Sequence, residues 1–202
     1  MRLVSLKIWK YQEGQSLQLC DFENLQFIQF FQRSTAREQL QFHSRTIVDH
    51  TEPGKRQTVK LEGNVGYCHT WIHPSGVACT AVTDNEYPLR VAYTLISDAI
   101  TAFLKQYPNN EASRQTADTS MPFQEGQALF DKFQNPDEAD KITKIEKELD
   151  EVKATVIKSM DDILKRGENL DSLMQKSGDL SATSYQFYKT AQKNNQCCSS
   201  FS

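Results

Sequence analysis

The longest regular pattern in the chain is a run of apolar residues spaced alternately three and four apart between residues 142 and 194. Such spacing places the side chains along one seam of a helix, as in a coiled coil. A helix of more than seven heptads is longer than a compact domain buries within itself, so the pattern predicts a long helix that packs against partner helices. The apolar seam positions are Ile142, Ile145, Leu149, Val152, Val156, Ile163, Leu170, Leu173, Leu180, Phe187 and Ala191, and the weak ones are Ser159, Ser177 and Ser184.

A single arginine interrupts this seam. Arg166 lies between Ile163 and Leu170, and a guanidinium at a core position is costly unless its donors find partners. Two copies of the helix would bring two arginines together, whereas helices that offer neutral oxygens, such as those of Gln, would satisfy the group and fix the register. The alternative is an ordinary coiled coil in which the arginine snorkels from a partly exposed position. The complete seam, centred on one arginine, favours a hetero-oligomeric bundle.

The first two thirds of the chain have a different pattern. Apolar and polar residues alternate in the strands expected near residues 4–8 and 16–20, and a capping-box pattern opens a helix over residues 35–51. Three strands follow near residues 57–61, 65–72 and 77–83, then a helix over residues 88–107 and a short one near residues 123–133. The order of two strands, helix, three strands and helix predicts a layered α+β domain.

Composition limits the classes of function. The chain has 202 residues, 38% of them apolar, a formal net charge of −3 and no basic block, which excludes nucleic acid as an expected partner. No stretch approaches eighteen consecutive apolar residues, so no membrane-spanning helix is expected. The N-terminal run MRLVSLKIWKY lacks the apolar core of a signal peptide, and Arg2 excludes N-myristoylation. Five cysteines without framework spacing favour a reducing compartment.

Nothing in the sequence indicates an enzyme. A phosphate-binding glycine loop, a GxSxG motif and a paired-carboxylate arrangement are all missing from the sequence. His69 and His73, next to Cys68, have neither a fourth ligand nor zinc-site spacing. We therefore expect no catalytic residue, no bound cofactor and no metal site.

The run ILKRGENLDSLMQKSGDL, with its seam of apolar layers, resembles an R-SNARE motif. The resemblance implies that Arg166 is the zero layer, which meets three glutamines from three Q-SNARE helices. It implies that the seam residues are the core layers of a four-helix bundle whose formation drives the fusion of vesicle and target membranes.

The segments DNEYPLRVAYTL and FFQRSTAREQLQF resemble the longin domain of longin-type R-SNAREs. The resemblance implies a profilin-like α+β fold, with a five-stranded antiparallel sheet and flanking helices, followed by the long helical SNARE coiled-coil motif. We expect a longin domain over residues 1–136, the SNARE motif over residues 137–196 and a tail over residues 197–202.

Phe42 stands out within the predicted helix of residues 35–51. It lies about 200° around the helix from the buried Leu40, and its neighbours on that face, Glu38, Arg45 and Thr46, are polar. It is either a docking residue or an isolated exposed apolar side chain, which is common. In longin-type SNAREs the resemblance implies that this surface binds the protein's own SNARE motif and closes the molecule.

The tail QCCSSFS is similar to that of the lipid-anchored longin R-SNAREs, which lack a transmembrane helix. The resemblance implies palmitoylation of Cys197 and prenylation of Cys198. It also implies a location in the cytosol and on the cytoplasmic face of Golgi and endosomal or vacuolar vesicles. The tail departs from the C-a-a-X pattern because Ser199 holds the fourth position from the end, which leaves a five-residue box or a double-cysteine route as the alternatives.

Two other classes of function remain open from the residues. A coiled-coil adaptor or tether would not drive fusion and would tolerate the loss of Arg166. A thiol-acyl enzyme using Cys197 or Cys198 lacks any nearby base in the sequence and ranks last.

Overall fold

A six-stranded mixed sheet forms the centre of the computed structural model, which describes residues 1–61, 65–108, 111–139, 154–157 and 159–198 (backbone only for residues 191–198). The strand order is β2-β1-β5-β4-β3-β6. Five strands pair in antiparallel fashion, and β6 is parallel to β3. The strands are β1 Leu3–Lys10, β2 Leu17–Glu23, β3 Arg56–Leu61, β4 Gly66–Ile72, β5 Val77–Thr83 and β6 Thr155–Ile157.

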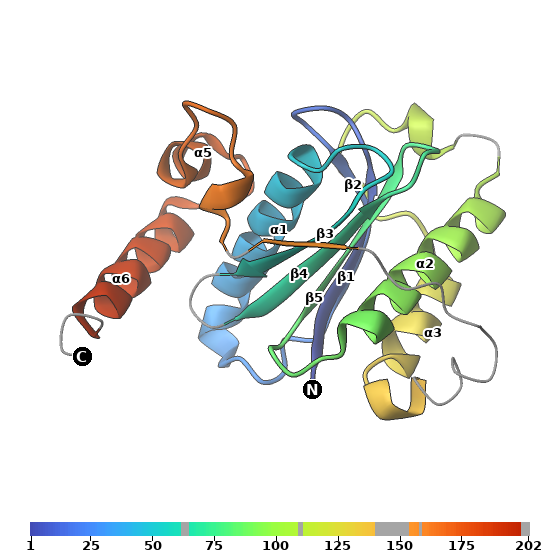
Figure 1. Cartoon of the computed structure of the whole chain (residues 1–202), viewed down its shortest axis with the longest axis horizontal. Helices are drawn as coiled ribbons and strands as arrows, with labels where there is room; N and C mark the ends of the chain where they lie inside the picture. Colours follow the sequence, from blue (N-terminus) through green and yellow to red (C-terminus); the bar gives the residue numbers. More distant parts are fainter. Residues whose placement is uncertain (62–64, 109–110, 140–153, 158, 199–202) are drawn as a thin grey trace.

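Helices cover both faces of the sheet (Figure 1). Helix α1 (Arg33–Asp49), preceded by the 3-10 turn η1 (Phe30–Gln32), packs on one face. Helices α2 (Leu89–Gln106) and α3 (Gln124–Lys132) pack on the other face. The 3-10 turn η3 (Ala112–Arg114) lies between these two helices in the chain. Every residue of β5 is buried, as expected of a central strand whose two faces are both covered. The predicted α+β class, with five antiparallel strands and flanking helices, is confirmed.

The C-terminal segment, defined here as the described residues 154–198, lies across the α1 side of the sheet (Figure 1). It consists of β6, the 3-10 turn η4 (Asp161–Ile163), helix α5 (Leu170–Lys176) and helix α6 (Ala182–Cys198). In the single chain, the described part of the region predicted as one long helix is instead divided into these short elements. The physical reason is that an apolar seam without partner helices must find another surface, and short elements can follow α1 and the edge of the sheet. One break falls at Gly167, whose φ of +93° is a backbone conformation that favours glycine.

A buried polar network accounts for the histidine of β4. His69 lies 3.0 Å from the hydroxyl oxygens of both Thr58 and Thr83, and the hydroxyl of Tyr93 lies 3.0 Å from that of Thr58. Burial lowers the pKa of His69 to about 3, so the ring is neutral and ties α2 to the sheet. Within the described ranges, no group of three or more His, Cys, Asp or Glu is placed to hold a metal ion. No helix among the described residues is both long and apolar enough to cross a membrane.

Candidate functional site

The C-terminal segment and the N-terminal domain share one apolar cluster, which we call the docking cluster. Phe42 of α1 belongs to it and is only 3% exposed. The N-terminal domain contributes Val4, Leu25, Leu40, Phe42, Ile47, Val59, Leu61, Cys68 and Val82. The C-terminal segment contributes Met160, Leu170, Met174 and Tyr188, with Ile157, Ile163, Leu164, Leu173, Leu180 and Tyr185 partly buried against them.

Phe42 is therefore not an isolated exposed side chain in this structure. Its ring is 5.5 Å from that of His43, and the His43 ring is in turn 6.3 Å from that of Tyr188 on α6. The aromatic rings of α1 and α6 thus form a continuous layer. Burying a phenylalanine ring contributes about 1.5–3 kcal/mol, so this layer is a substantial part of what holds the segment in place.

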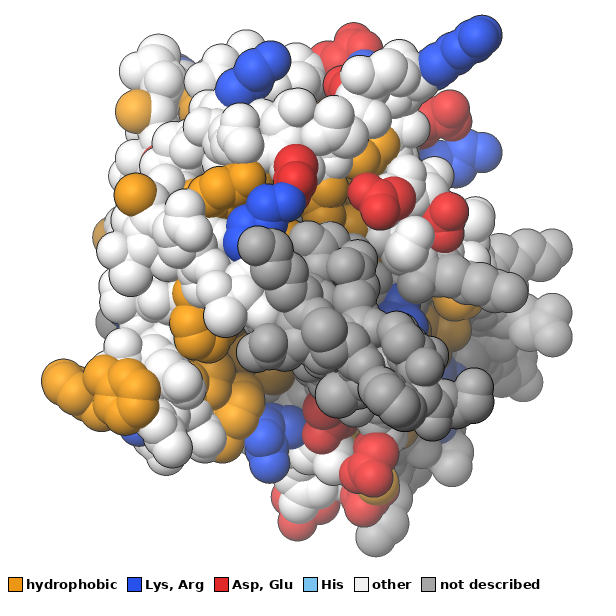
Figure 2. All heavy atoms as spheres, turned by 90° about the vertical axis from the view of Figure 1, so that its left-hand side faces the viewer, with side chains coloured by type: hydrophobic (Ala, Val, Ile, Leu, Met, Phe, Trp, Pro, Cys, Tyr) orange, Lys and Arg blue, Asp and Glu red, His pale blue; other side chains and the backbone are white. Residues whose placement is uncertain are grey.

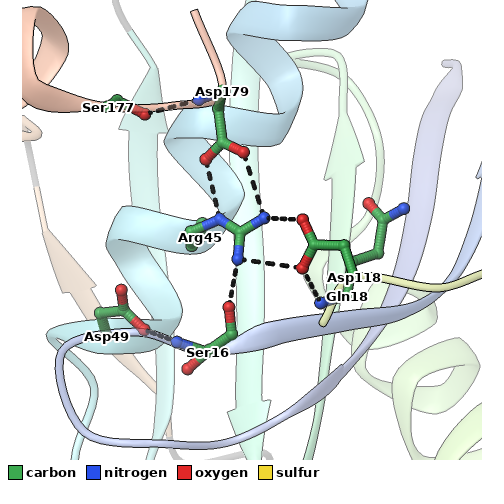
Figure 3. A network of polar contacts seen from close by, with 7 residues as sticks. All are labelled: Ser16, Gln18, Arg45, Asp49, Asp118, Ser177 and Asp179. Atoms are coloured by element: carbon green, nitrogen blue, oxygen red, sulfur yellow. Dashed lines mark hydrogen bonds and ion pairs between the residues drawn. The ribbon is translucent and has the colours of Figure 1, made fainter. Parts of the chain in front are cut away.

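The polar neighbours of Phe42 on α1 also contact the C-terminal segment. The guanidinium of Arg45 donates hydrogen bonds of 2.8 and 3.1 Å to the two carboxylate oxygens of Asp179 (Figure 3). The same group donates to the carboxylate of Asp118 and to the backbone oxygen of Ser16. Burial opposes the charge, but the bonds to Asp118 and Asp179 outweigh it and raise the pKa of Arg45. One side chain therefore joins three distant parts of the chain.

Two further polar contacts lie on either side of this junction. A carboxylate oxygen of Glu38 accepts a 2.8 Å hydrogen bond from the backbone N–H of Ser181. At the other end of α1, Nε2 of His50 lies 2.8 Å from a carboxylate oxygen of Glu168. The polar face of α1 thus contacts the segment at Glu38 and Arg45, and the contact continues to His50, just beyond the end of the helix.

Strand β6 extends the contact to the edge of the sheet. Residues Thr155, Val156 and Ile157 pair with Gln57, Thr58 and Val59 of β3 in parallel register. Backbone hydrogen-bonding groups on an edge strand need partners, and β6 supplies them for the middle of β3. The segment is thus held by backbone pairing, by apolar packing and by ion pairs.

The structure distributes the predicted seam residues over several environments. Leu170 is buried, and Ile163, Leu173 and Leu180 are half-buried in the docking cluster. Val156 and Phe187 are 60% and 46% exposed, and Arg166 is exposed in the turn before α5. Ala191, Cys197 and Cys198 belong to the end of α6, residues 191–198, of which only the backbone is described. The other seam positions lie outside the described residues: Ile142, Ile145, Leu149 and Val152.

Several docking residues were missed by the sequence interpretation. They share one property, which is that they are apolar but lie outside the seam: Ile157, Met160, Leu164, Met174, Tyr185 and Tyr188. That surplus of apolar residues is the signal that would have identified them, because a helix that only joined a bundle would carry polar residues there.

Comparison with known families agrees with this architecture. The synaptobrevin family model matches residues 141–200, and the longin model, described as a regulated-SNARE-like domain, matches residues 22–129. A longin domain followed by a synaptobrevin motif defines the class of this protein as a longin-type R-SNARE, a protein of vesicle trafficking.

Curated relatives make the assignment more specific. The synaptobrevin homologue YKT6 of Schizosaccharomyces pombe is 36% identical over 198 residues, and that of Saccharomyces cerevisiae is 34% identical over 199 residues. Each alignment covers 98% of both chains. A VAMP-like protein, YKT61 of Arabidopsis thaliana, is 38% identical over 169 residues, which is 84% of this chain and 83% of that protein. The chain therefore belongs to the YKT6 family of synaptobrevin homologues. Synaptobrevin-family SNAREs pair with other SNARE helices in a complex.

The buried His43 predicts a pH dependence of stability. Burial lowers the pKa of His43 to about 4 from the ordinary value of 6.5, and its Nε2 finds no hydrogen-bond partner in the described part of the chain. The folded state therefore binds fewer protons than the unfolded state between these values, so stability is present above pH 6.5 and is lost as the pH falls toward 4. Between pH 7 and pH 5 we expect His43 to contribute a loss on the order of 2 kcal/mol, in addition to the loss from the buried His69, measured by urea unfolding as the difference between the parent chain and a variant without His43.

The control for this measurement is His43→Leu, which keeps an apolar group of similar size and removes the titration. Its loss of stability between the two pH values should be smaller than that of the parent chain. Equal losses in both proteins would assign the pH dependence to other groups.

Proposed function

We propose that this protein is an autoinhibited R-SNARE whose longin domain holds its own SNARE motif until three Q-SNARE helices replace it. The observation that carries the proposal is that the same side chains belong both to the docking cluster and to the seam of the SNARE motif. Leu170, Leu173 and Leu180 pack in the docking cluster and are also seam positions of the SNARE motif. A side chain buried on α1 cannot at the same time fill the core of a bundle, so the two arrangements exclude each other.

In the proposed bundle the arginine has a different environment. Arg166 is exposed in the single chain, in a turn outside the docking cluster. In the four-helix bundle it would lie at the centre, with its donors bound by three glutamine side chains. The free energy released by burying the seam residues from residue 142 to residue 191 would draw the two membranes together.

The proposed attachment to the membrane is through Cys197 and Cys198 at the end of α6. Cys197 would carry a palmitoyl group and Cys198 a prenyl group, on the cytoplasmic face of Golgi and endosomal or vacuolar vesicles. The domain limits we propose are a longin domain of residues 1–136, a SNARE motif of residues 137–196 and a lipidated tail of residues 197–202.

The decisive experiment on the bundle concerns Arg166. Arg166→Ala should leave the stability of the single chain unchanged, because the side chain is exposed there. In the bundle it would leave three glutamine side chains unpaired, at a cost of about 1–3 kcal/mol for each unsatisfied buried group. Thermal melting of the reconstituted four-helix complex measures this loss, with Arg166→Gln as a matched variant that restores an amide to the layer. An adaptor or tether that does not drive fusion would melt unchanged.

The test of autoinhibition concerns Phe42. Phe42→Glu places a carboxylate inside the docking cluster and should release the C-terminal segment. Hydrogen exchange across residues 155–190 should then rise about tenfold or more. Asp179→Asn removes one of the two carboxylates bound to Arg45 but leaves Asp118, so its effect should be smaller. Equal exchange in all three proteins would mean that the longin domain does not restrain the segment.

The tail prediction follows from the affinity of lipid chains for membranes. Each buried methylene contributes about 0.8 kcal/mol, yet one acyl chain gives only marginal binding. The nearby Lys189 is already bound to Asp171, so electrostatic support is small. Cys198→Ser should leave the protein in the cytosol, and Cys197→Ser should give a protein that cycles on and off membranes. Cell fractionation measures both, and a double variant that stays on membranes would contradict the lipid anchor.

A further inference from the structure

The turn that leads into α1 exposes three phenylalanines. Phe30 and Phe31 are 85% and 76% exposed, and Phe27, four positions from Phe31, is 46% exposed. Phe30 and Phe31 are the most exposed large apolar side chains among the described residues. Single exposed apolar side chains are ordinary, but three within five positions form a patch that marks an interaction site. We call residues 26–32 the aromatic turn.

The aromatic turn is held in shape by the rest of the domain. The guanidinium of Arg33 donates hydrogen bonds of 3.0 and 3.2 Å to the backbone oxygens of Ile28 and Gln26. The backbone N–H of Ile28 donates to the backbone oxygen of Leu25, a buried member of the docking cluster. Because the backbone is fixed in this way, the phenyl rings project without any cost of ordering a loose loop.

Basic side chains flank the aromatic turn, and one of them, Arg37, is paired with Glu23. Residues 26–37 contain Arg33 and Arg37 and no acidic residue. The guanidinium of Arg2 lies 4.3 Å from the centre of the Phe27 ring, a cation–π contact. The nearest acid on the preceding strand, Glu23, is bound to Lys7 and Arg37, with only 9% of its side chain exposed. Exposed aromatic rings flanked by arginines are the chemistry that binds the headgroup region of an anionic membrane.

The position of the turn fits the same surface. In Figure 1 the turn η1 and the start of α1 lie at the lower end of the molecule, and the last turn of α6 points to that end as well. Figure 2 shows apolar side chains that project from the lower part of the molecule. Helix α6 ends at Cys198, so its last described turn and the aromatic turn lie toward the same end of the molecule.

We propose that the aromatic turn is a membrane-contact site that inserts Phe30 and Phe31 into the headgroup region of an anionic bilayer. Only the choice of which end faces the membrane rests on the proposed lipid anchor. The contact itself needs neither a lipid chain nor a SNARE partner. Together with the proposed anchor, it would keep the folded chain at the surface while the tail carries a single lipid, because one lipid chain alone binds only marginally.

Vesicle binding of the full, unmodified chain tests the site. The parent should co-sediment with vesicles of phosphatidylcholine and phosphatidylserine, and more weakly with phosphatidylcholine alone. The double variant Phe30→Ser, Phe31→Ser should bind vesicles at least about tenfold more weakly than the parent, because neither position then inserts an aromatic ring into the bilayer. Val65→Ser is the matched control, since Val65 is 45% exposed on the turn before β4, and its binding should equal that of the parent.

A second measurement reports insertion directly. In Phe30→Trp the new indole should be quenched by brominated lipids beyond the quenching seen in the parent, whose Trp9 is fully buried and whose Trp71 is half-buried on β4. A parent chain that does not bind anionic vesicles, or a double variant that binds as well as the parent, overturns the proposal. Loss of a protein partner by the double variant, with vesicle binding intact, would assign the turn to that partner instead.

Failure here is separable from failure of the proposed function. The vesicle assay contains no Q-SNARE helices, and the bundle assay contains no membrane. The Phe30, Phe31 double variant should assemble and melt in the bundle like the parent. A bundle that melts normally while vesicle binding is absent leaves the R-SNARE function intact and removes only the membrane-contact site.

Discussion

The apolar seam residues need a surface that covers them, and among the described residues the N-terminal domain covers Ile163, Leu170, Leu173 and Leu180. That surface is the outer face of α1 together with the free edge of β3. The break of the segment into β6, α5 and α6 follows from this constraint, and so does the burial of Phe42 in the docking cluster. In the proposed closed form the longin domain is a substitute partner, and its fit to the segment would set how strongly the segment resists exchange for other helices.

Apolar packing alone would allow the segment to slide along α1, and the polar contacts fix its position. Arg45 binds Asp179 through two hydrogen bonds and also binds Asp118, which lies between α2 and α3 in the chain. The guanidinium fork requires a fixed direction for each carboxylate, so a shift of the segment by one residue would break the pair. The network therefore fixes the register of the segment on α1, in addition to any free energy that it contributes to the contact.

Much of the N-terminal fold could be predicted from the sequence, because alternation and helical spacing are local signals. The long-range contacts could not. The pairing of β6 with β3 involves only three residues on each strand, too few to leave a pattern. Arg45 and Asp179 are 134 positions apart, and nothing local joins them. Phe42 stands out in the sequence because it is an apolar residue on a polar helix face. Met160, Met174 and Tyr188 do not stand out, because the regular seam by itself accounts for an apolar segment. A segment with two alternative partners carries two overlapping patterns, and the more regular one hides the other.

Strand β3 carries a consequence for the solubility of the open protein. When the segment leaves α1, the pairing of β6 is lost and β3 becomes an exposed edge, the usual starting point for strand-to-strand aggregation between molecules. The strand has the sequence RQTVKL, with the exposed Lys60 near one end and Arg56 at the other. Cations at both ends of a short edge strand repel a second copy of the same strand. In the proposed open state, these cations would therefore keep open copies of the chain from joining one another.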